Sequence, residues 1–162
     1  MEKKIELLNL LEKDSRLSAS EAGKLLGLSE EEVHSILKGL EGEGVIAGYT
    51  AIINWEKVSE EKVNALIEVK AVPTRGFGFD KLAHRIAKFD EVDSIYLCSG
   101  GFDFMIEIKG RSMREVSSFV FEKLSTLDDV QSTATHFLLK KYKDHGMMME
   151  KETKDNREKV VL

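Results

Sequence analysis

A short glycine-rich segment in the second half of the chain combines groups that could bind an α-amino acid. It reads Gly100-Gly101-Phe102-Asp103. Open backbone amides at the two glycines can hold a carboxylate, while the Asp103 carboxylate can accept hydrogen bonds from an amino group. The alternative interpretation is a hairpin turn in which the aspartate only closes the loop, and for an isolated segment this alternative is favoured.

Other reactive side chains give weaker indications. Thr133 and Thr135 are second candidate effector contacts, although threonine in a strand is usually just a good β-former. Cys98 is expected to be a small buried hydrophobe rather than a nucleophile. The four histidines show no metal-ligand spacing with one another or with carboxylates. The sequence therefore predicts neither a metal nor a cofactor.

A predicted helix over residues 30–41 exposes polar side chains that could contact double-stranded DNA in the major groove. The candidate DNA contacts are Ser29, Glu30, His34, Ser35 and Lys38. The glutamates at 30–32 suit the positive end of the helix dipole, but they repel phosphates. We therefore expect weak DNA binding, and the alternative is a solvated helix face in a domain that has lost DNA binding.

Two tandem capping boxes indicate which elements position this helix. In each box a serine is followed three residues later by a glutamate, at 18–21 and again at 29–32. These two helix starts leave space for one short helix over 21–26 and a turn at Gly27, which predicts a helix-turn-helix. An apolar stripe over 3–12 predicts a preceding helix.

Hydrophobic periodicity in the second half predicts a ferredoxin-like βαββαβ sandwich, with four antiparallel strands and both helices on one face. The Gly100-Gly101 pair is expected to form a tight primed turn between the strands at 92–99 and 102–109. The expected elements are strand 63–71, helix 79–87, strands 92–99 and 102–109, helix 112–124 and strand 130–141. The fold class is therefore α+β, with a three-helix N-terminal domain.

The two faces of this sheet are expected to differ. One should pack on the helices through Val63, Ala65, Ile67 and Val69, and through Phe102, Phe104, Ile106 and Ile108. The other face is expected to carry Leu66, Ile95, Leu97 and Met105, with Phe137 and Leu139 as further candidates. A mixed apolar face left in water favours coverage by a second sheet, so we expect at least a dimer.

Composition limits the class of protein. The chain has 162 residues, a net charge of −5 and a single cysteine. Residues 1–50 hold six basic against ten acidic side chains, so the acidity lies in the predicted DNA-binding segment. No run of eighteen apolar residues, no signal-peptide pattern and no cysteine pair is present, which favours a cytoplasmic protein without a membrane span.

Several motifs, taken in order, resemble the Lrp/AsnC (feast/famine) transcription regulators over about residues 3–143. The motifs are Asp14-Ser15-Arg16-Leu17-Ser18, Leu26-Gly27-Leu28-Ser29, Leu40-Glu41 with Gly44-Val45-Ile46 and Gly48-Tyr49, Ser99-Gly100-Gly101-Phe102-Asp103, and the segment from Thr133 to Tyr142. The resemblance implies a DNA-binding domain joined to a domain that senses small molecules. It also implies amino acid effectors bound at the glycine turn between subunits, and homodimers that often form octamers.

The resulting organisation is a helix-turn-helix domain over 1–46, an extended connector over 47–62, a βαββαβ effector and oligomerisation domain over 63–143, and a charged tail over 144–162. The tail is expected to be disordered or to order on a partner. The predicted function is a DNA-binding transcription regulator that senses an amino acid-like effector. The first alternative is an oligomeric effector sensor with weak or lost DNA binding.

A second alternative is an enzyme, because relatives with this two-domain layout include tetrapyrrole decarboxylases. Such an enzyme needs a histidine and arginine constellation around a deep pocket. His84, Arg85 and His136 are too scattered in the sequence to nominate one. No catalytic residue is therefore assigned.

Overall fold

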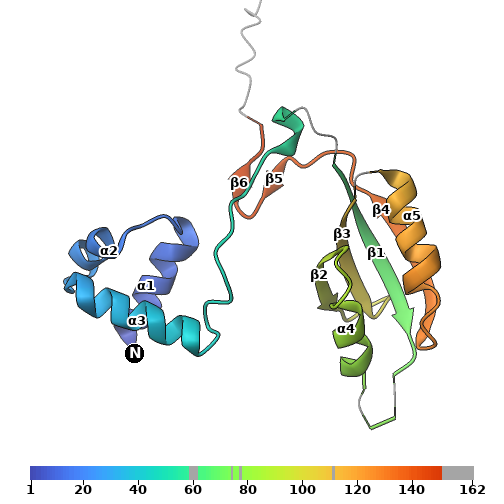
Figure 1. Cartoon of the computed structure of the whole chain (residues 1–162), viewed down its shortest axis with the longest axis horizontal. Helices are drawn as coiled ribbons and strands as arrows, with labels where there is room; N and C mark the ends of the chain where they lie inside the picture. Colours follow the sequence, from blue (N-terminus) through green and yellow to red (C-terminus); the bar gives the residue numbers. More distant parts are fainter. Residues whose placement is uncertain (59–61, 74, 77, 111, 151–162) are drawn as a thin grey trace, which may run out of the picture. The chain divides into compact units, whose positions relative to one another are not determined.

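The computed structural model describes residues 1–58, 62–73, 75–76, 78–110 and 112–150. These residues divide into two compact units, one spanning Met1–Ile52 and the other beginning at Ile53 (Figure 1). Each unit has its own cluster of buried apolar side chains. The functional domain limits at residues 46, 62 and 143 remain predictions.

The first unit is a three-helix bundle. It consists of α1 (Glu2–Lys13), α2 (Ala19–Leu26) and α3 (Glu30–Gly42). Leu7 and Val33 are fully buried where the helices meet, because apolar residues recur on one face of each helix. The predicted first and third helices are confirmed, each within one residue at either end.

Both predicted capping boxes are present. The Ser18 Oγ accepts a hydrogen bond from the Glu21 amide, and the Ser29 Oγ accepts one from the Glu32 amide, each at 3.2 Å. In return, each glutamate side chain accepts a hydrogen bond from the backbone amide of its serine. Gly27 ends α2 in the left-handed conformation, with φ 67°, which a glycine adopts without strain.

Gly23 allows the turn between α2 and α3 to pack closely. Its carbonyl accepts a hydrogen bond from the Leu28 amide at 2.9 Å. A Cβ atom at this position would lie 2.6 Å from the Leu28 carbonyl oxygen, which belongs to the backbone. The turn therefore requires a residue without a side chain at this point of α2.

Residues 47–54, at the start of the segment expected to be extended, form neither helix nor strand. The Tyr49 hydroxyl donates a hydrogen bond to a Glu41 carboxylate oxygen at 2.9 Å. A short 3-10 turn, η1 (Trp55–Lys57), interrupts the segment expected to be extended over 47–62. Residues 59–61 of that predicted segment lie outside the described residues.

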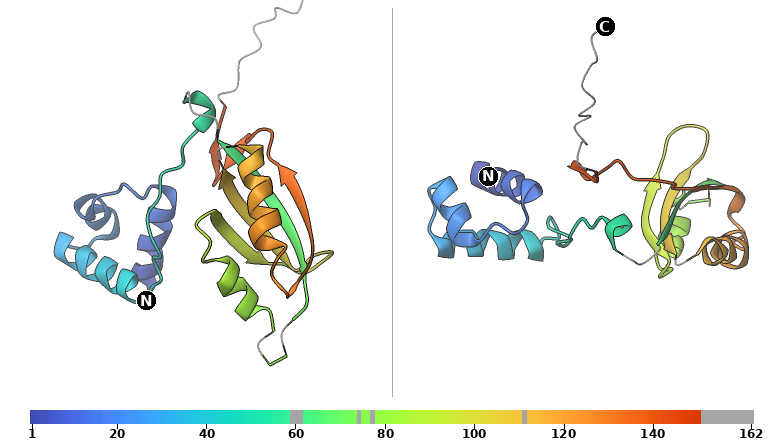
Figure 2. Two further views of the ribbon diagram at one scale, coloured as in Figure 1. Left: turned by 45° about the vertical axis from the view of Figure 1, so that its right-hand side comes forward. Right: turned by 90° about the horizontal axis from the view of Figure 1, so that it is seen from above.

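The second unit is a four-stranded antiparallel sheet with the order β2-β3-β1-β4. Helices α4 and α5 both lie on one face of it (Figure 2). The predicted ferredoxin-like βαββαβ order is confirmed. Its elements are β1 (Val63–Ala71), α4 (Asp80–Ile86), β2 (Val92–Leu97), β3 (Phe104–Gly110), α5 (Met113–Phe119), a π-helical segment η2 (Val120–Leu124) and β4 (Val130–Phe137). None of the described helices combines the length and the hydrophobicity of a transmembrane span.

The face beneath the helices forms the core of this unit. Ile67 on β1 and Phe104 on β3 are completely buried. The Phe104 ring also meets the Phe79 ring edge to face, with the centroids 5.6 Å apart. The remaining face of the sheet, which we call the open face, carries the alternate residues of each strand, including Leu66 and Met105 as predicted.

Three residues predicted for the open face lie instead on the helix-covered side. Ile95 pairs with Ile106, Leu97 pairs with Phe104, and Phe137 pairs with Ala65, and paired residues of antiparallel strands share a face. For β2 the reason is a register irregularity between Val92 and Ser94, which shifts the alternation by one residue. Tyr96 therefore takes the open-face position opposite Met105.

The end of the described chain also departs from the prediction. Strand β4 ends at Phe137 rather than near residue 141. Residues expected to begin an irregular tail instead form a small hairpin of β5 (Lys143–Asp144) and β6 (Met147–Met148). The rest of the predicted tail, 151–162, lies outside the described residues.

Candidate DNA-binding and effector sites

The candidate DNA contacts all lie at the start of α3 or on its solvent side. Ser29 is the N-cap residue, and both its Oγ and its backbone amide are engaged by Glu32. Three of the other four are exposed and lie four residues apart, which places them on one face: Glu30, His34 and Lys38. Ser35 is exposed beside them.

The electrostatics of this unit disfavour phosphate contacts. The His34 Nε2 lies 3.7 Å from a Glu30 carboxylate oxygen. Lys38 is the one cation of α3, and it forms no ion pair with any residue that the structure describes. Since each phosphate contact depends largely on a basic side chain, this helix attracts DNA phosphates only weakly.

Other basic residues of the unit are partly neutralised. Arg16 forms two side-chain hydrogen bonds with the Asp14 carboxylate, at 2.9 and 2.8 Å. The hydrogen bonds from Arg16 lower the pKa of Asp14 from 3.8 to about 2. Lys3 pairs with Glu6 across one helical turn, at 2.9 Å. These exposed pairs leave few cations free to contact phosphates.

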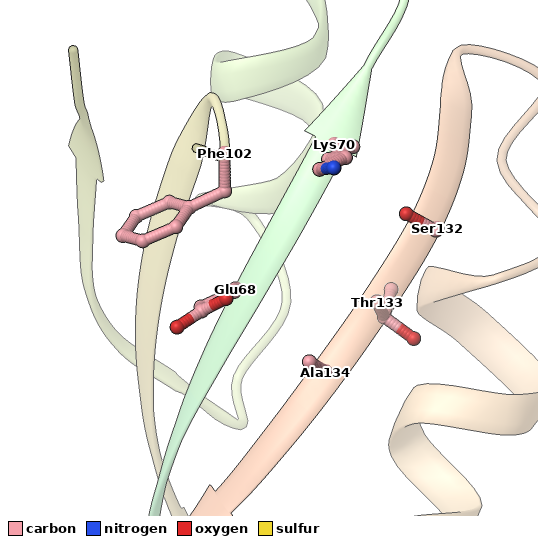
Figure 3. A pocket seen from close by; sticks show the side chains of 6 residues that line it. All are labelled: Glu68, Lys70, Phe102, Ser132, Thr133 and Ala134. Atoms are coloured by element: carbon pink, nitrogen blue, oxygen red, sulfur yellow. The ribbon is translucent and has the colours of Figure 1, made fainter. Parts of the chain in front are cut away.

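The second unit has a pocket of about 260 Å³ at one end of the sheet. Figure 3 shows side chains from three segments around it, namely β1, β4 and the loop before β3. The lining residues are Glu68, Lys70, Phe102, Ser132, Thr133 and Ala134. Most of them belong to the open face, because Glu68 pairs with Ala134 and Lys70 with Ser132.

The pocket holds both signs of charge. Glu68 and Lys70 are two residues apart on β1, so their side chains leave the same face about 7 Å apart. A Glu68 carboxylate oxygen lies 3.2 Å from the His136 Nε2 on β4. Lys70 is exposed and forms no ion pair with a described residue. This arrangement suits a small ligand that itself carries both charges.

Phe102 lies on the open face, contrary to the prediction that it faces the helices. Strand β3 begins only at Phe104, so the alternation does not extend back to residue 102. Figure 3 shows the Phe102 ring on the same side of the sheet as Glu68. Its apolar ring gives the pocket one hydrophobic wall.

The loop that carries Phe102 is wider than the predicted two-residue turn. The Cys98 amide donates a hydrogen bond to the Asp103 carbonyl at 2.8 Å, which leaves residues 99–102 in the loop. Gly100 has φ 144°, whereas Gly101 has no positive φ. The glycine pair therefore does not form the primed turn that was predicted from the sequence.

Asp103 anchors this loop to the end of β1. Its amide donates to the Val69 carbonyl at 2.9 Å, and its Oδ2 accepts from the Ala71 amide at 2.8 Å. The register of β1 with β4 shifts at the same place, between Lys70 and Ala71. Neither Asp103 nor the two glycines line the pocket, but the anchored loop places Phe102 beside it.

Of the two candidate threonines, Thr133 lines the pocket and Thr135 does not. Thr133 lines the pocket, although it pairs with Val69 and Figure 3 shows its side chain directed away from Glu68. Thr135 pairs with Ile67, which places it on the helix-covered side of β4. Glu68 and Lys70 were not predicted as effector contacts, although their spacing of two residues along a strand places them on one face. Among the described residues, no three His, Cys, Asp or Glu side chains gather as a metal site would require.

Comparison with known families accounts for most of the chain. The profile described as "Winged helix-turn-helix DNA-binding" matches residues 2–47. The profile described as "Lrp/AsnC ligand binding domain" matches residues 64–148. The "Uncharacterized HTH-type transcriptional regulator YugG" of Bacillus subtilis is 48% identical over 162 residues, covering 99% of this chain and 96% of the relative.

Solved structures of similar fold include transcription regulators. The leucine response regulatory protein LrpA of Mycobacterium tuberculosis is 26% identical, with a TM-score of 0.72, and the match covers 91% of this chain and 97% of LrpA. The regulator NMB0573 of Neisseria meningitidis, solved as an L-Met complex, is 26% identical with a TM-score of 0.69. That match covers 89% of this chain and 92% of the other.

Proposed function

Because the chain belongs to the Lrp/AsnC family of transcription regulators, we propose that its ligand-binding domain senses a free α-amino acid and so controls DNA binding. The chain is a DNA-binding transcription regulator with a ligand-binding domain. Its relatives are regulators rather than enzymes, which sets aside the enzymatic alternative.

The observation that carries the proposal is the pair of opposite charges in the pocket. Glu68 can accept hydrogen bonds from an α-ammonium group, and Lys70 can donate to an α-carboxylate. Backbone amides of Gly100 and Gly101, in the loop beside the pocket, are proposed as further donors to the carboxylate. A ligand with only one of these charges would leave either Lys70 without a charged partner or Glu68 with only its His136 contact.

The pocket also favours a particular class of side chain. Phe102 is its one aromatic wall, and Ala134 adds a second apolar surface. An apolar amino acid side chain would bury surface against both. The Neisseria relative was solved with bound L-methionine, which supports an apolar amino acid as the effector.

A thermal-shift screen of the twenty amino acids tests this proposal. A ligand at 100 times its Kd stabilises a protein by about 2.7 kcal/mol, which raises the Tm of a unit of this size by at least about 10 °C. Glu68→Gln and Lys70→Met should each weaken the response at least about tenfold in ligand concentration, because each removes a charged hydrogen-bond partner. Lys81→Met on α4, which lies on the helix side of the sheet, is the matched control.

An Asp103→Asn variant distinguishes two possible roles of this aspartate, positioning the loop or binding the ligand. If it positions the loop, Asp103→Asn should keep the response, because an amide oxygen can still accept from the Ala71 amide. If the carboxylate binds the ligand ammonium, the same variant should lose the response. A wild type that responds to no amino acid, or a Glu68→Gln variant that responds equally, would show that the proposed effector site is wrong.

We propose that α3 contacts DNA weakly in each protomer. Lys38 contributes attraction, while Glu30 and Glu31 repel phosphates. Replacing both glutamates by glutamine should raise the affinity for a duplex from the upstream region of the chain's own gene, measured by fluorescence anisotropy at low salt. Lys38→Met should lower it. No binding by any of these proteins at tens of micromolar would favour the sensor that has lost DNA binding.

We propose a homodimer, and higher assembly to an octamer, as the active form. On the open face, Tyr96 is exposed and Leu66 and Met105 are partly exposed among charged side chains. A second copy of the sheet would bury them, and repeated weak DNA contacts would then add through effective concentration. Light scattering on the purified chain measures this directly, and a monomer at micromolar concentration would contradict it.

A further inference from the structure

The hairpin of β5 and β6 has a defined turn. His145 and Gly146 both have positive φ, 44° and 82°, as the two central residues of a primed turn require. The strands pair at Lys143 with Met148 and at Asp144 with Met147. An isolated two-stranded hairpin is marginally stable in water, so contacts outside it must hold it in place.

The residue after the hairpin fastens it to the start of the second unit. Met149 is only 8% exposed, and its amide donates to the Tyr142 carbonyl at 2.9 Å. The Met149 carbonyl accepts a hydrogen bond from the Asn54 Nδ2 at 2.6 Å. Asn54 directly precedes η1, and Figure 1 shows the hairpin beside that turn. The hairpin thus holds the point where the connector enters the ligand-binding unit.

Lys141 fastens the other end of the hairpin to the sheet. Its Nζ lies 3.4 Å from a Glu107 carboxylate oxygen on the open face of β3 and 3.1 Å from an Asp144 oxygen in β5. Burial alone would lower the pKa of Lys141, but the hydrogen bond that its ammonium donates to Asp144 and the charge of Glu107 raise this pKa above its ordinary value. The side chain is 29% exposed and stays protonated across the neutral range.

We propose that residues 141–149 form a latch, in which Lys141 joins the open face of the sheet to the hairpin and Met149 joins the hairpin to the connector at Asn54. When the Lys141 contacts are lost, the hairpin detaches and the connector is released at its base. Through these non-covalent contacts, a change on the open face can reach the connector that leads to the helix-turn-helix unit.

The latch has two discrete states, hairpin docked or hairpin detached, and hydrogen exchange can measure both. In η1 the Lys57 and Val58 amides donate to the Asn54 and Trp55 carbonyls, at 3.2 and 3.0 Å. Exchange of peptides covering 52–58 reports on the connector base, and exchange of peptides covering 142–149 reports on the hairpin. Both are measured on the full chain by mass spectrometry, with no ligand added.

Lys141→Met should accelerate exchange about tenfold in both peptides, because it removes a charged partner shared by two carboxylates. Lys143→Met is the matched control, since Lys143 is exposed in β5 and forms no ion pair among the described residues. It should change exchange less than about twofold. Asn54→Ala should accelerate the 52–58 peptide, because it removes the hydrogen bond to Met149.

Equal exchange in the Lys141→Met and Lys143→Met variants would overturn the latch. So would a hairpin that detaches in Lys141→Met while the 52–58 peptide keeps its protection. If Lys141→Met fails to fold, Asp144→Asn keeps the side-chain shape and removes one partner charge, and it should accelerate both peptides. Unchanged exchange in that variant also overturns the proposal. Because no effector is used, failure of the amino acid screen leaves this test unaffected.

Discussion

The helix-turn-helix unit and the ligand-binding unit hold their candidate contact residues in different ways. Helix α3 begins at a capping box whose two members, Ser29 and Glu32, are three residues apart in the sequence. The pocket instead gathers side chains from β1, from the loop before β3 and from β4, between positions 68 and 134. The first site depends on local hydrogen bonds, and the second depends on strand register.

This difference determines which changes harm which site. A local cap can be altered with an effect confined to one helix end. A change in the core beneath the sheet disturbs every strand that lines the pocket. The two compact units also have separate clusters of buried side chains, so damage to one is expected to leave the other folded.

The largest expected effect is that of Phe104→Ala. The Phe104 side chain is completely buried under the helices, so its removal should cost about 3–5 kcal/mol of unfolding free energy in the second unit. Urea unfolding followed by circular dichroism measures this cost. Phe121→Ala is the matched control, because Phe121 is 82% exposed on η2 and should change stability by less than about 0.5 kcal/mol. Loss of the α1–α3 helices at the same urea concentration would show that the units are not independent.

Gly23→Ala should destabilise the first unit by about 1–3 kcal/mol. The added Cβ would lie 2.6 Å from a backbone oxygen, so the turn between α2 and α3 must move. Thermal unfolding monitored by helical circular dichroism gives the change. Gly39→Ala inside α3 has open space and should be neutral or stabilising by up to about 1 kcal/mol. Equal effects of the two substitutions would disprove the close approach at Gly23.

Ser29→Ala should cost about 1 kcal/mol by removing the cap of α3. The same measurement applies, and Ser35→Ala, on the exposed face of the same helix, should cost less than about half of that. Ser29→Asp should retain most of the stability, because aspartate is also a good N-cap residue. A pocket that lost its ligand response in Ser29→Ala would contradict the separation of the two sites.

The smallest effect concerns the pH dependence of Asp14. Its pKa of about 2 in the folded chain lies below its ordinary value of 3.8 because Arg16 donates hydrogen bonds to it. A depressed pKa stabilises the fold above pH 3.8, and this contribution is lost as the pH falls through about 2. An NMR titration of the Asp14 carboxyl should show a midpoint near 2. Arg16→Gln should return the midpoint towards 3.8, and no change would exclude Arg16 as the cause.

The sequence predicted the elements of both units because their signals are local. The serine and glutamate of each capping box are three residues apart, and both boxes form as predicted. The strand from Val63 to Ala71 was predicted with its observed limits, since alternation continues along it until Pro73. Such features need no information about distant parts of the chain.

The sequence did not predict the details that depend on contacts between distant residues. The irregularity between Val92 and Ser94 reverses the faces of β2, and nothing in the local pattern indicates it. Asp103 finds its partner, the Ala71 amide, 32 residues away. The hairpin turn at His145-Gly146 had a local signal, since glycine follows a residue that tolerates positive φ, but the surrounding charges suggested a tail.

The uneven exposure of three consecutive methionines has a chemical consequence. Met147 and Met148 are 48% and 62% exposed, whereas Met149 is shielded. A peroxide oxidises an accessible thioether to the sulfoxide, so the first two should react readily and Met149 only while it is uncovered. The oxidation rate of Met149, divided by that of Met147 or Met148, therefore reports how often this part of the chain opens.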